Sequence, residues 1–328
     1  MKLKLNQITH GDCIEVLKDC EPFADLIFAD PPFNIGYKYD KYQDKVKGEQ
    51  YVEWSEKWMT ACKKVLKPGG SFYIAIGDDY AASIQIIATQ KLKLKMRNWI
   101  IWHYTFGQQM KNKFARSHTH IFYFVLDNNN FTFNSDAVRV ISDRQKKYKD
   151  KRANPLGKLP DDVWNEYPRI CGTFDERTEF HPCQMPESLL ARIIRVSSDK
   201  GNTVLDPFSG SGTTPVVASK LGRNYVGIEI SSNYVHESTK RLEVAGNDIE
   251  GEVPQKWTKE MDMELKWIYH ENKISTEDLC NEPELLVLFT EKVNLRLGRE
   301  KNPFTPVDIK KHLTNLRKAA KLGPLRGQ

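Results

Sequence analysis

Short apolar segments alternate with longer amphipathic segments along most of this 328-residue chain. The expected strands are residues 25–29, 71–76, 99–104, 121–126, 203–205 and 225–229. The expected helices are residues 50–66, 80–90, 186–198, 213–221 and 232–245. Strands that alternate with helices indicate a mostly parallel sheet with helices on its faces. The sequence therefore predicts an α/β fold of the doubly wound type.

Two regions interrupt this alternation. Residues 128–177 are polar, basic and rich in turn residues, and we interpret them as an insertion on the C-terminal edge of the sheet. After about residue 253, Ser275 and Thr305 stand at apparent helix starts and are followed by apolar residues at helical spacing. We therefore predict a main domain at residues 1–252 and a small helical C-terminal appendage at residues 253–328.

The chain lacks the features that mark several other classes of protein. It contains no run of about 18 apolar residues, so we expect no transmembrane helix. Its amino terminus has no apolar signal stretch, which predicts a cytoplasmic protein. The six cysteines form no C-x-x-C pair and no zinc-finger spacing with histidine, so we expect no metal site.

Basic residues are concentrated in one part of the chain. The formal net charge is only +6, but residues 91–120 contain seven basic residues and no acid. A second basic run, RQKKYKDKR, follows at residues 144–152. A single charge run is usually a solvated face, whereas two runs interleaved with aromatic residues favour a polyanionic partner.

A glycine-containing loop follows the expected strand at residues 203–205. The stretch TVLDPFSGSGTT runs from this strand into Asp206 and then through Gly210 and Gly212 to the next helix. Glycines allow a sharp turn and a close approach of the backbone to a ligand. The following strand ends in Glu229, about 20 residues further on, where an acid is placed to bind ribose hydroxyls.

The loop does not match the patterns that hold a chain of phosphates. No lysine follows Gly212, as a P-loop requires, and the full G-x-G-x-x-G spacing is absent. A nucleoside without a pyrophosphate therefore fits best. S-adenosylmethionine is such a ligand, because its ribose diol suits Glu229 and its sulfonium cation favours nearby acids such as Asp206.

A second unusual stretch, Asp30-Pro31-Pro32-Phe33, ends the expected strand at residues 25–29. The exocyclic amine of a nucleobase is a weak nucleophile, because its lone pair is delocalised into the ring. A carboxylate oxygen of Asp30 and the Pro31 carbonyl are placed to accept its two N–H groups, and the prolines stiffen the turn that holds them. Extrusion of a base costs a few kcal/mol, and stacking on Phe33 returns roughly 1–3 kcal/mol.

These two stretches together resemble those of the amino-methyltransferases that modify exocyclic nitrogens in DNA. That family carries a [D/N/S]-P-P-[Y/F/W] catalytic motif and an F-x-G-x-G cofactor motif, which here are Asp30–Phe33 and Phe208–Gly212. The catalytic motif comes first, as in the permuted group called the β class. The resemblance covers about residues 5–250 and implies a Rossmann-like methyltransferase sheet, S-adenosyl-L-methionine as cofactor and double-stranded DNA as substrate.

The resemblance also implies a set of cofactor-binding residues. GDCIEVL at residues 11–17 matches a motif whose aspartate, here Asp12, contacts the cofactor adenine. HPCQMPESLLARII at residues 181–194 matches the segment before the cofactor helix, with Cys183 and Met185 where the family usually has Thr and Lys. The implied cofactor residues are Asp12, Cys13, His181, Gln184, Asp206, Pro207, Phe208, Ser209, Gly210, Ser211, Gly212, Thr213, Glu229 and Ile230.

In this family the target-recognition region lies between the two halves of the enzyme, which here places it within about residues 108–177. This region includes the second basic run and the end of the first. The candidates for contacts with DNA phosphates are Lys111, Lys113, Arg116, Lys146 and Lys147. The recognised base sequence, a companion restriction endonuclease and a homodimer are left open.

Three other functions are compatible with parts of the sequence. Pro182-Cys183-Gln184 mimics the nucleophile motif of cytosine-C5 methyltransferases, but here the cysteine precedes the cofactor loop and no Glu-Asn-Val partner is present. Protein glutamine methyltransferases carry a related Asn-Pro-Pro-Tyr motif, but after their cofactor loop. The intact Asp30, Gly210 and Glu229 argue against a DNA-binding module with a decayed cofactor site.

One residue separates the two candidate target bases. The N6 of adenine and the N4 of cytosine are both amines beside a ring nitrogen. In the family, Asp at the first motif position goes mostly with adenine, and Ser goes mostly with cytosine. Asp30 therefore predicts transfer to the N6 of adenine, with the N4 of cytosine as the alternative.

Overall fold

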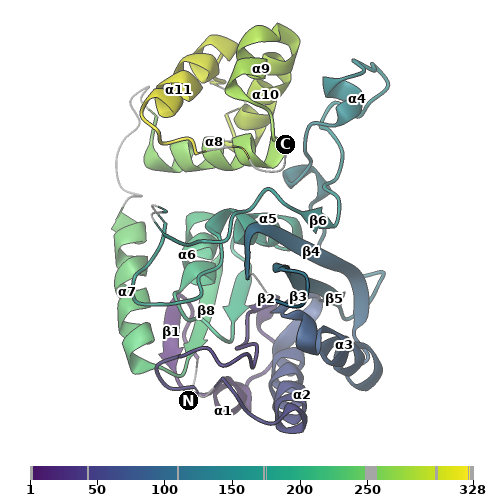
Figure 1. Cartoon of the computed structure of the whole chain (residues 1–328), viewed down its shortest axis with the longest axis vertical. Helices are drawn as coiled ribbons and strands as arrows, with labels where there is room; N and C mark the ends of the chain where they lie inside the picture. Colours follow the sequence, from purple (N-terminus) through teal and green to yellow (C-terminus); the bar gives the residue numbers. More distant parts are fainter. Residues whose placement is uncertain are drawn as a thin grey trace. The chain divides into compact units, whose positions relative to one another are not determined.

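The computed structural model describes residues 3–42, 44–108, 111–172, 174, 176–247, 257–299, 302–323 and 325. Contacts between residues divide the chain into two compact units, whose elements are labelled in Figure 1. The first unit comprises residues 1–134, 162–164 and 169–250. The second comprises residues 135–161, 165–168 and 251–328.

The first unit is built on a sheet that has eight strands within the described residues, in the order β1-β8-β7-β2-β3-β5-β4-β6. These are β1 (Gln7–His10), β2 (Ala24–Ala29), β3 (Leu66–Ile76), β4 (Lys95–Gln108), β5 (Arg116–Val125), β6 (Val163–Trp164), β7 (Thr203–Asp206) and β8 (Asn224–Glu229). The pairs from β1 to β3 are parallel, β5 is antiparallel to β3 and β4, and β6 is parallel to β4. The predicted strands and the mostly parallel sheet are confirmed.

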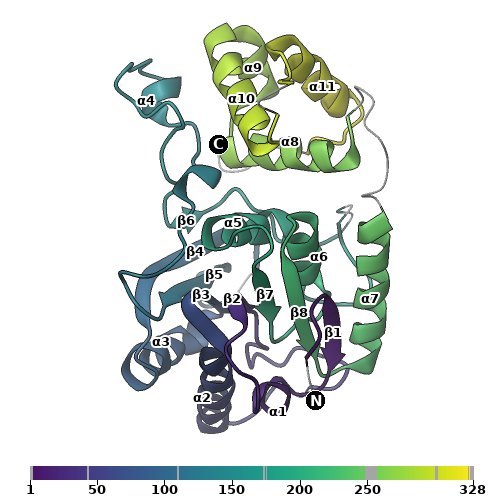
Figure 2. The same ribbon diagram turned by 180° about the vertical axis from the view of Figure 1, so that it is seen from behind.

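Helices cover both faces of this sheet (Figures 1 and 2). One group is α1 (Cys13–Leu17), α2 (Gly48–Val65) and α3 (Asp78–Ile86) with its π-helical continuation Ile87–Lys91, and the other is α5 (Glu187–Ser197), α6 (Thr213–Lys220) and α7 (Ser232–Asn247). Successive side chains of a strand point to opposite faces. In β3, Phe72 packs against Trp58 of α2, and Tyr73 shares a 2.8 Å hydrogen bond with Ser197 of α5. The doubly wound arrangement is therefore confirmed.

The carboxyl ends of the parallel strands lie at one edge of the sheet. Because β2 and β7 are parallel neighbours, with Ile27 opposite Leu205, the turn after β2 and the loop after β7 leave the sheet side by side. The end of β8 is next to β7, and the end of β1 is next to β8. Ligands of open α/β sheets bind in the crevice outside these ends.

Some local features differ from the sequence prediction. The strand expected at residues 71–76 begins earlier, at Leu66, and residues 67–70 form a bulge within β3, since the pairing steps from Ala24 opposite Leu66 to Leu26 opposite Ser71. Gly69, at φ +84, accommodates this irregularity. β4 and β5 are 14 and 10 residues long and form an antiparallel hairpin, which is longer than the apolar runs suggest. The pattern also does not indicate the short elements β1, α1 and β6.

The second unit has a helical core of its own. Its described α-helices are α4 (Asp143–Lys146), α8 (Lys259–Asn272), α9 (Thr276–Asn281), α10 (Pro283–Arg296) and α11 (Pro306–Lys318). The predicted helix starts are confirmed: Ser275 caps α9 by accepting from Asp278 N, and Thr305 caps α11 by accepting from Asp308 N. The buried apolar side chains include Leu265, Ile268, Phe289, Ile309 and Leu313.

Part of the insertion belongs to this second unit. Ile141 N donates to Asn272 Oδ1 at 2.7 Å, and Lys146 Nζ lies 3.8 Å from a carboxylate oxygen of Asp278. Residues 135–161 therefore pack with the C-terminal helices, although the sequence groups them with the main domain. The functional roles predicted for residues 108–177 and 253–328 stay predictions.

Two kinds of feature are missing from the described residues. Among the helices of this part of the chain, none combines the length and the apolarity that crossing a membrane requires. Within the same residues, no group of three or more His, Cys, Asp or Glu side chains is placed to hold a metal ion.

Candidate active site

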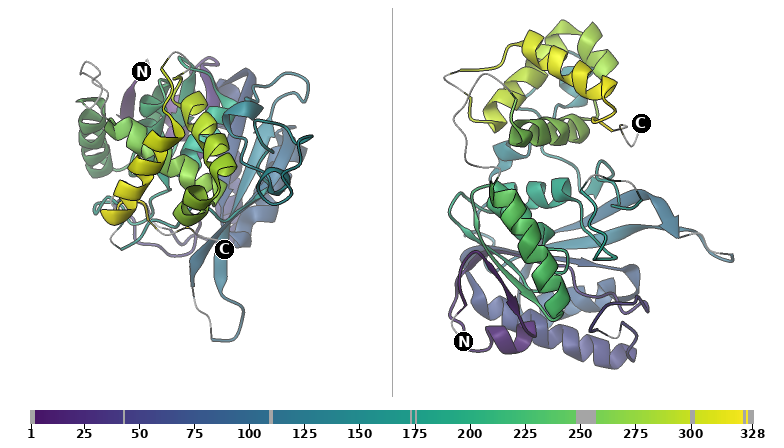
Figure 3. Two further views of the ribbon diagram at one scale, coloured as in Figure 1. Left: turned by 90° about the horizontal axis from the view of Figure 1, so that it is seen from above. Right: turned by 90° about the vertical axis from the view of Figure 1, so that its left-hand side faces the viewer.

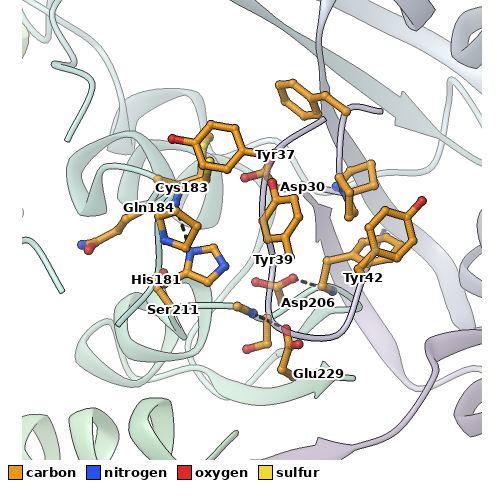
Figure 4. A pocket seen from close by; sticks show the side chains of 18 of the residues that line it. Asp30, Tyr37, Tyr39, Tyr42, His181, Cys183, Gln184, Asp206, Ser211 and Glu229 are labelled. Atoms are coloured by element: carbon orange, nitrogen blue, oxygen red, sulfur yellow. Dashed lines mark hydrogen bonds between the residues drawn. The ribbon is translucent and has the colours of Figure 1, made fainter. Parts of the chain in front are cut away.

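A pocket of about 560 Å³ opens at the carboxyl ends of the parallel strands. Its lining contains Asp30–Phe33 and Asp206–Ser211, the two stretches singled out from the sequence (Figure 4). Gly11–Cys13 after β1 and Glu229–Ser231 after β8 extend this lining. The Asp30 carboxyl group and the glycine loop thus share one cavity, which is the geometry that a methyl donor and an acceptor base need.

The glycine loop is held close to its neighbours. Gly210 has φ +47, and a Cβ at this position would lie 2.8 Å from Nε2 of His181. Gly210 N donates to Glu229 Oε2 at 2.8 Å, and Ser231 N donates to Glu229 Oε1 at 2.8 Å. Glu229 therefore ties the loop to the end of β8. Gly212, at φ +73, precedes α6 as its N-cap and is not among the pocket-lining residues.

Three carboxyl groups of the pocket ionise less readily than they do in water. Burial, together with the nearby Asp206, raises the pKa of Asp30 to about 8. Burial raises the pKa of Asp206 to about 7, although hydrogen bonds from Thr214 and the Phe208 N–H limit the rise. Burial also raises the pKa of Glu229. A cation favours the ionised form of such groups, so this cluster suits the sulfonium of S-adenosylmethionine.

The segment before α5 contributes another part of the lining: His181, Pro182, Cys183, Gln184 and Met185. Burial lowers the pKa of His181 to about 4, so its ring is neutral near pH 7 and does not repel a cation. Gln184 Oε1 accepts from Thr178 N at 2.8 Å, and Gln184 Nε2 donates to the Glu176 carbonyl at 2.6 Å. The Gln184 side chain therefore braces the loop that carries His181, and its predicted contact with the cofactor stays a prediction.

The surroundings of Cys183 disfavour a nucleophilic role. Burial and the nearby charge of Asp30 raise the pKa of its thiol. Cytosine-C5 chemistry needs a thiolate that attacks the ring, and a raised pKa keeps the sulfur protonated. The structure thus adds a physical argument against the alternative suggested by Pro182-Cys183-Gln184.

Asp12 and Cys13 enter the pocket at the turn after β1. Asp12 is the N-cap of α1, and its Oδ1 accepts from Ile14 N at 2.8 Å. This bond fixes the carboxyl group at the pocket wall, where the resemblance places the adenine contact. Burial and the adjacent Asp12 raise the pKa of Cys13, so its thiol behaves as an apolar wall group.

Packing holds the Asp30 turn in place. Tyr51 Oη donates to the Pro32 carbonyl at 2.6 Å. The ring of Phe33 lies against Gly77, where a Cβ would approach the ring to 3.3 Å. Because these contacts come from the packing of the protein itself, they hold the turn that carries Asp30 and Pro31 in a fixed position.

The sequence does not point to the aromatic part of the pocket. Its residues come from the loop after Phe33, from β4 and β5, and from one further loop: Tyr37, Tyr39, Tyr42, Trp102, Tyr104, His118, Thr119, Arg169 and Ile170. Tyr104 Oη donates to the His118 carbonyl at 3.1 Å, and the Arg169 guanidinium lies 5.7 Å from the centre of the Tyr104 ring. These rings offer stacking surfaces for a base. The available signal is the period-two spacing of Trp102 and Tyr104, which puts both on one face of β4.

The predicted phosphate-binding residues fall on both units. Lys111 and Lys113 are exposed in the hairpin between β4 and β5, and Arg116 lines the pocket. Arg116 is also paired with Asp78 at 2.9 Å and with Asp79 at 3.1 Å. The other two candidates lie at α4 in the second unit, where Lys146 faces Asp278 and Lys147 faces Asp143.

Comparison with known proteins agrees with the geometry of this site. A family model described as DNA methylase matches residues 24–240. The chain belongs to the DNA methylase family. This methylase is 39% identical over 249 residues to the DNA adenine methyltransferase YhdJ of Escherichia coli, a match that covers 73% of the chain and 83% of the relative. It is 36% identical over 235 residues to the type II methyltransferase M.HpaI of Haemophilus parainfluenzae, with 71% and 73% covered.

Solved structures share the fold of the methylase. The complex of M1.HpyAVI with SAM gives a TM-score of 0.51 at 24% identity and covers 72% of this chain and 98% of that one. The cytosine-N4-specific PvuII DNA methyltransferase gives a TM-score of 0.56 at 17% identity and covers 81% and 92%. These likenesses show the fold alone, so the target base has to be argued from the residues of the site.

The affinity of the methylase for S-adenosylmethionine is expected to rise with pH. Asp206 of the cofactor loop, with a pKa of about 7, is largely protonated below that value, and a cation binds better to its ionised form. Binding should therefore release a proton, and affinity should increase by up to about tenfold per pH unit until Asp206 is ionised.

Calorimetry across pH 6 to 9 measures this directly, and S-adenosylhomocysteine is the matched control because it lacks only the sulfonium methyl and its charge. Its affinity should change less over the same range. Equal pH profiles for the two ligands would contradict the electrostatic role of the Asp206 carboxyl group.

Proposed function

We propose that this methylase transfers the methyl group of S-adenosylmethionine to the exocyclic N6 of adenine at a specific sequence in double-stranded DNA. The observation that carries the proposal is the common pocket of Asp30 and the glycine loop. The aspartate at the first motif position favours adenine over cytosine. A relative that is 39% identical is named a DNA adenine methyltransferase, which supports the same choice.

The side chains of the pocket have distinct parts in this reaction. S-adenosylmethionine, when bound, supplies an electrophilic methyl group. Asp12, Asp206 and Glu229 line the cavity where its adenosine and sulfonium would be held. The Asp30 carboxylate and the Pro31 carbonyl accept the two N–H groups of the amine, which directs its lone pair away from the ring system. Fixed acceptors of this kind need no rearrangement during the reaction.

The target base has to leave the duplex to reach these groups. The amine at a Watson–Crick edge is inaccessible inside the helix, and extrusion costs a few kcal/mol. Phe33, Tyr104 and Trp102 line the same pocket and supply aromatic faces for the extruded base. Stacking on such a face offsets roughly 1–3 kcal/mol of that cost.

Nucleoside analysis tests the proposed product. Duplex DNA incubated with the methylase and S-adenosylmethionine is digested with nucleases, and the nucleosides are separated and identified by mass. We expect N6-methyladenine, formed about a thousandfold more slowly by an Asp30→Ala variant. Detection of N4-methylcytosine alone would replace adenine by cytosine as the target, and the absence of any methylated base would favour a DNA-binding module.

We also propose a cytoplasmic role in a restriction–modification pair. Relatives at 36% and 34% identity are named type II methyltransferases. A companion restriction endonuclease would cleave the same sequence when it is unmethylated. DNA from cells that express the methylase should then resist cleavage by an endonuclease that recognises the same sequence.

A further inference from the structure

The hairpin of β4 and β5 carries a phenylalanine in contact with solvent. Phe114 is 99% exposed, compared with 76% for Tyr148 and 72% for Val307, the next large apolar or aromatic side chains in the described part of the chain. A scattered apolar residue on a surface is ordinary. A ring with almost no protein contact is different, because it contributes nothing to the packing of the hairpin.

The neighbours of Phe114 are basic. Lys111 and Lys113 are exposed beside it, and the segment from residue 91 to residue 120 contains no acidic residue. A protein interface would surround an anchor ring with further apolar residues. A ring flanked by cations suits a nucleic-acid duplex instead. The phosphates of a duplex are anionic, and the faces of its stacked bases are apolar.

The hairpin also links Phe114 to the pocket. Trp102 and Tyr104 of β4 and Arg116 of β5 line the cavity. Phe114 precedes Arg116 by two residues, and a strand advances about 3.3 Å per residue, so Phe114 lies within roughly 10 Å of the pocket lining. Figure 3 shows this hairpin extending beyond the neighbouring strands of the sheet.

We propose that Phe114 is a wedge that enters the base stack beside the target and keeps the extruded base out of the duplex, while Lys111 and Lys113 contact the flanking phosphates. This proposal rests on the proposed function, since only an enzyme that extrudes a base from a duplex needs a wedge. Apolar side chains that insert between base steps unstack them. Phe114 is thus a positioning residue, and the amine chemistry stays with Asp30.

The test compares paired with unpaired targets. Two duplexes carry the site found by modified-base sequencing of DNA from cells expressing the methylase, and in one of them the target base faces an abasic site. The Phe114→Ala variant should lose roughly 5- to 100-fold in kcat/KM on the paired duplex. On the duplex with the abasic partner it should stay within about twofold of wild type, because extrusion there is already easy.

Two further variants serve as controls. Phe114→Trp should restore activity on the paired duplex, because its ring also stacks. Val244→Ala removes a side chain that is 69% exposed on α7 and should leave both rates unchanged. With 2-aminopurine at the target position, the fluorescence rise that reports extrusion should be strong for wild type and weak for Phe114→Ala.

The outcomes separate the two proposals. If the wild-type enzyme neither methylated DNA nor raised the 2-aminopurine fluorescence, the proposed function would be contradicted. Active wild type with an unchanged Phe114→Ala variant would overturn the wedge alone. An equal loss on both duplexes would also overturn it. If that equal loss came with dissociation of a dimer in sedimentation, the ring would instead belong to an interface between copies of the chain.

Discussion

Replacement of Asp30 by alanine is expected to lower the rate of methyl transfer by about a thousandfold while cofactor binding stays within a few-fold of wild type. The variant loses the fixed acceptor that polarises the amine, and the loss of one preorganised group of this kind typically costs a factor of 10² to 10³, or about 3–4 kcal/mol. The Asp30 carboxyl group lies in the pocket but at the end of β2 rather than on the glycine loop, so the cofactor keeps most of its contacts.

The measurement is single-turnover transfer of a labelled methyl group, with cofactor affinity determined by calorimetry on the same preparation. Asp30→Asn is the matched variant, because its amide oxygen still accepts one N–H group, and it should retain an intermediate rate. If Asp30→Ala turned over at the wild-type rate, the amine would be activated by another group. A large loss of cofactor affinity would instead assign Asp30 to the cofactor site.

Replacement of Gly210 by alanine should weaken cofactor binding by about tenfold to a hundredfold. The new Cβ would lie 2.8 Å from His181 Nε2. The ring cannot easily move aside, since its centre is 6.1 Å from that of Tyr39 and 4.8 Å from that of Tyr234. Overpacking of such a site costs about 1–3 kcal/mol, and a displaced loop would also lose the bond between Gly210 N and Glu229.

Gly201→Ala provides the control for this variant. Gly201 also has a positive φ, of +82, but a Cβ added there would meet nothing within 4 Å, and the residue is outside the pocket. Both variants carry the backbone strain of alanine in the left-handed region, and only Gly210→Ala adds the contact with His181. Calorimetry with S-adenosylhomocysteine should show near wild-type affinity for Gly201→Ala. Equal losses in the two variants would mean that backbone strain, not the shape of the pocket, controls binding.

The regular part of the fold follows from local sequence patterns. Apolar runs such as residues 71–76 and 203–205 are buried strands, and the helices after them have the expected bounds to within a few residues. β1 escapes detection because its four residues, QITH, are partly exposed and contain two polar side chains and one histidine. The full length of β4 and β5 cannot be predicted from the apolar runs, because polar residues extend both strands and pair through backbone hydrogen bonds.

The parts of the candidate site that can be predicted are the loops whose functional residues are consecutive in the sequence. Asp30–Phe33 and the loop after Asp206 stand out because prolines, glycines and acids directly follow apolar strands. Tyr104 and Arg169 do not stand out, since each becomes part of the site only through the path of the chain across the sheet. The bracing role of the Gln184 amide is likewise a tertiary property.

The grouping of residues 135–161 with the C-terminal helices could not be predicted locally. The hydrogen bond from Ile141 to Asn272 joins residues separated by 131 positions. The periodic pattern of either segment does not predict this contact. Arg296 of α10, which pairs with Glu264 and Glu271 of α8, is also an interaction within this unit. The composition shift near residue 253 marks a change of unit, but it does not reveal that an earlier segment joins the same unit.

A crystal structure of the methylase with sinefungin tests the central claim most directly, because an amine in this molecule replaces the sulfonium methyl. The adenosine should lie between Asp12 and Glu229, beside the loop at Gly210, with the amine facing the Asp30 carboxyl group. A ligand bound elsewhere, or an amine that points away from Asp30, would contradict the assignment of donor and acceptor to one pocket.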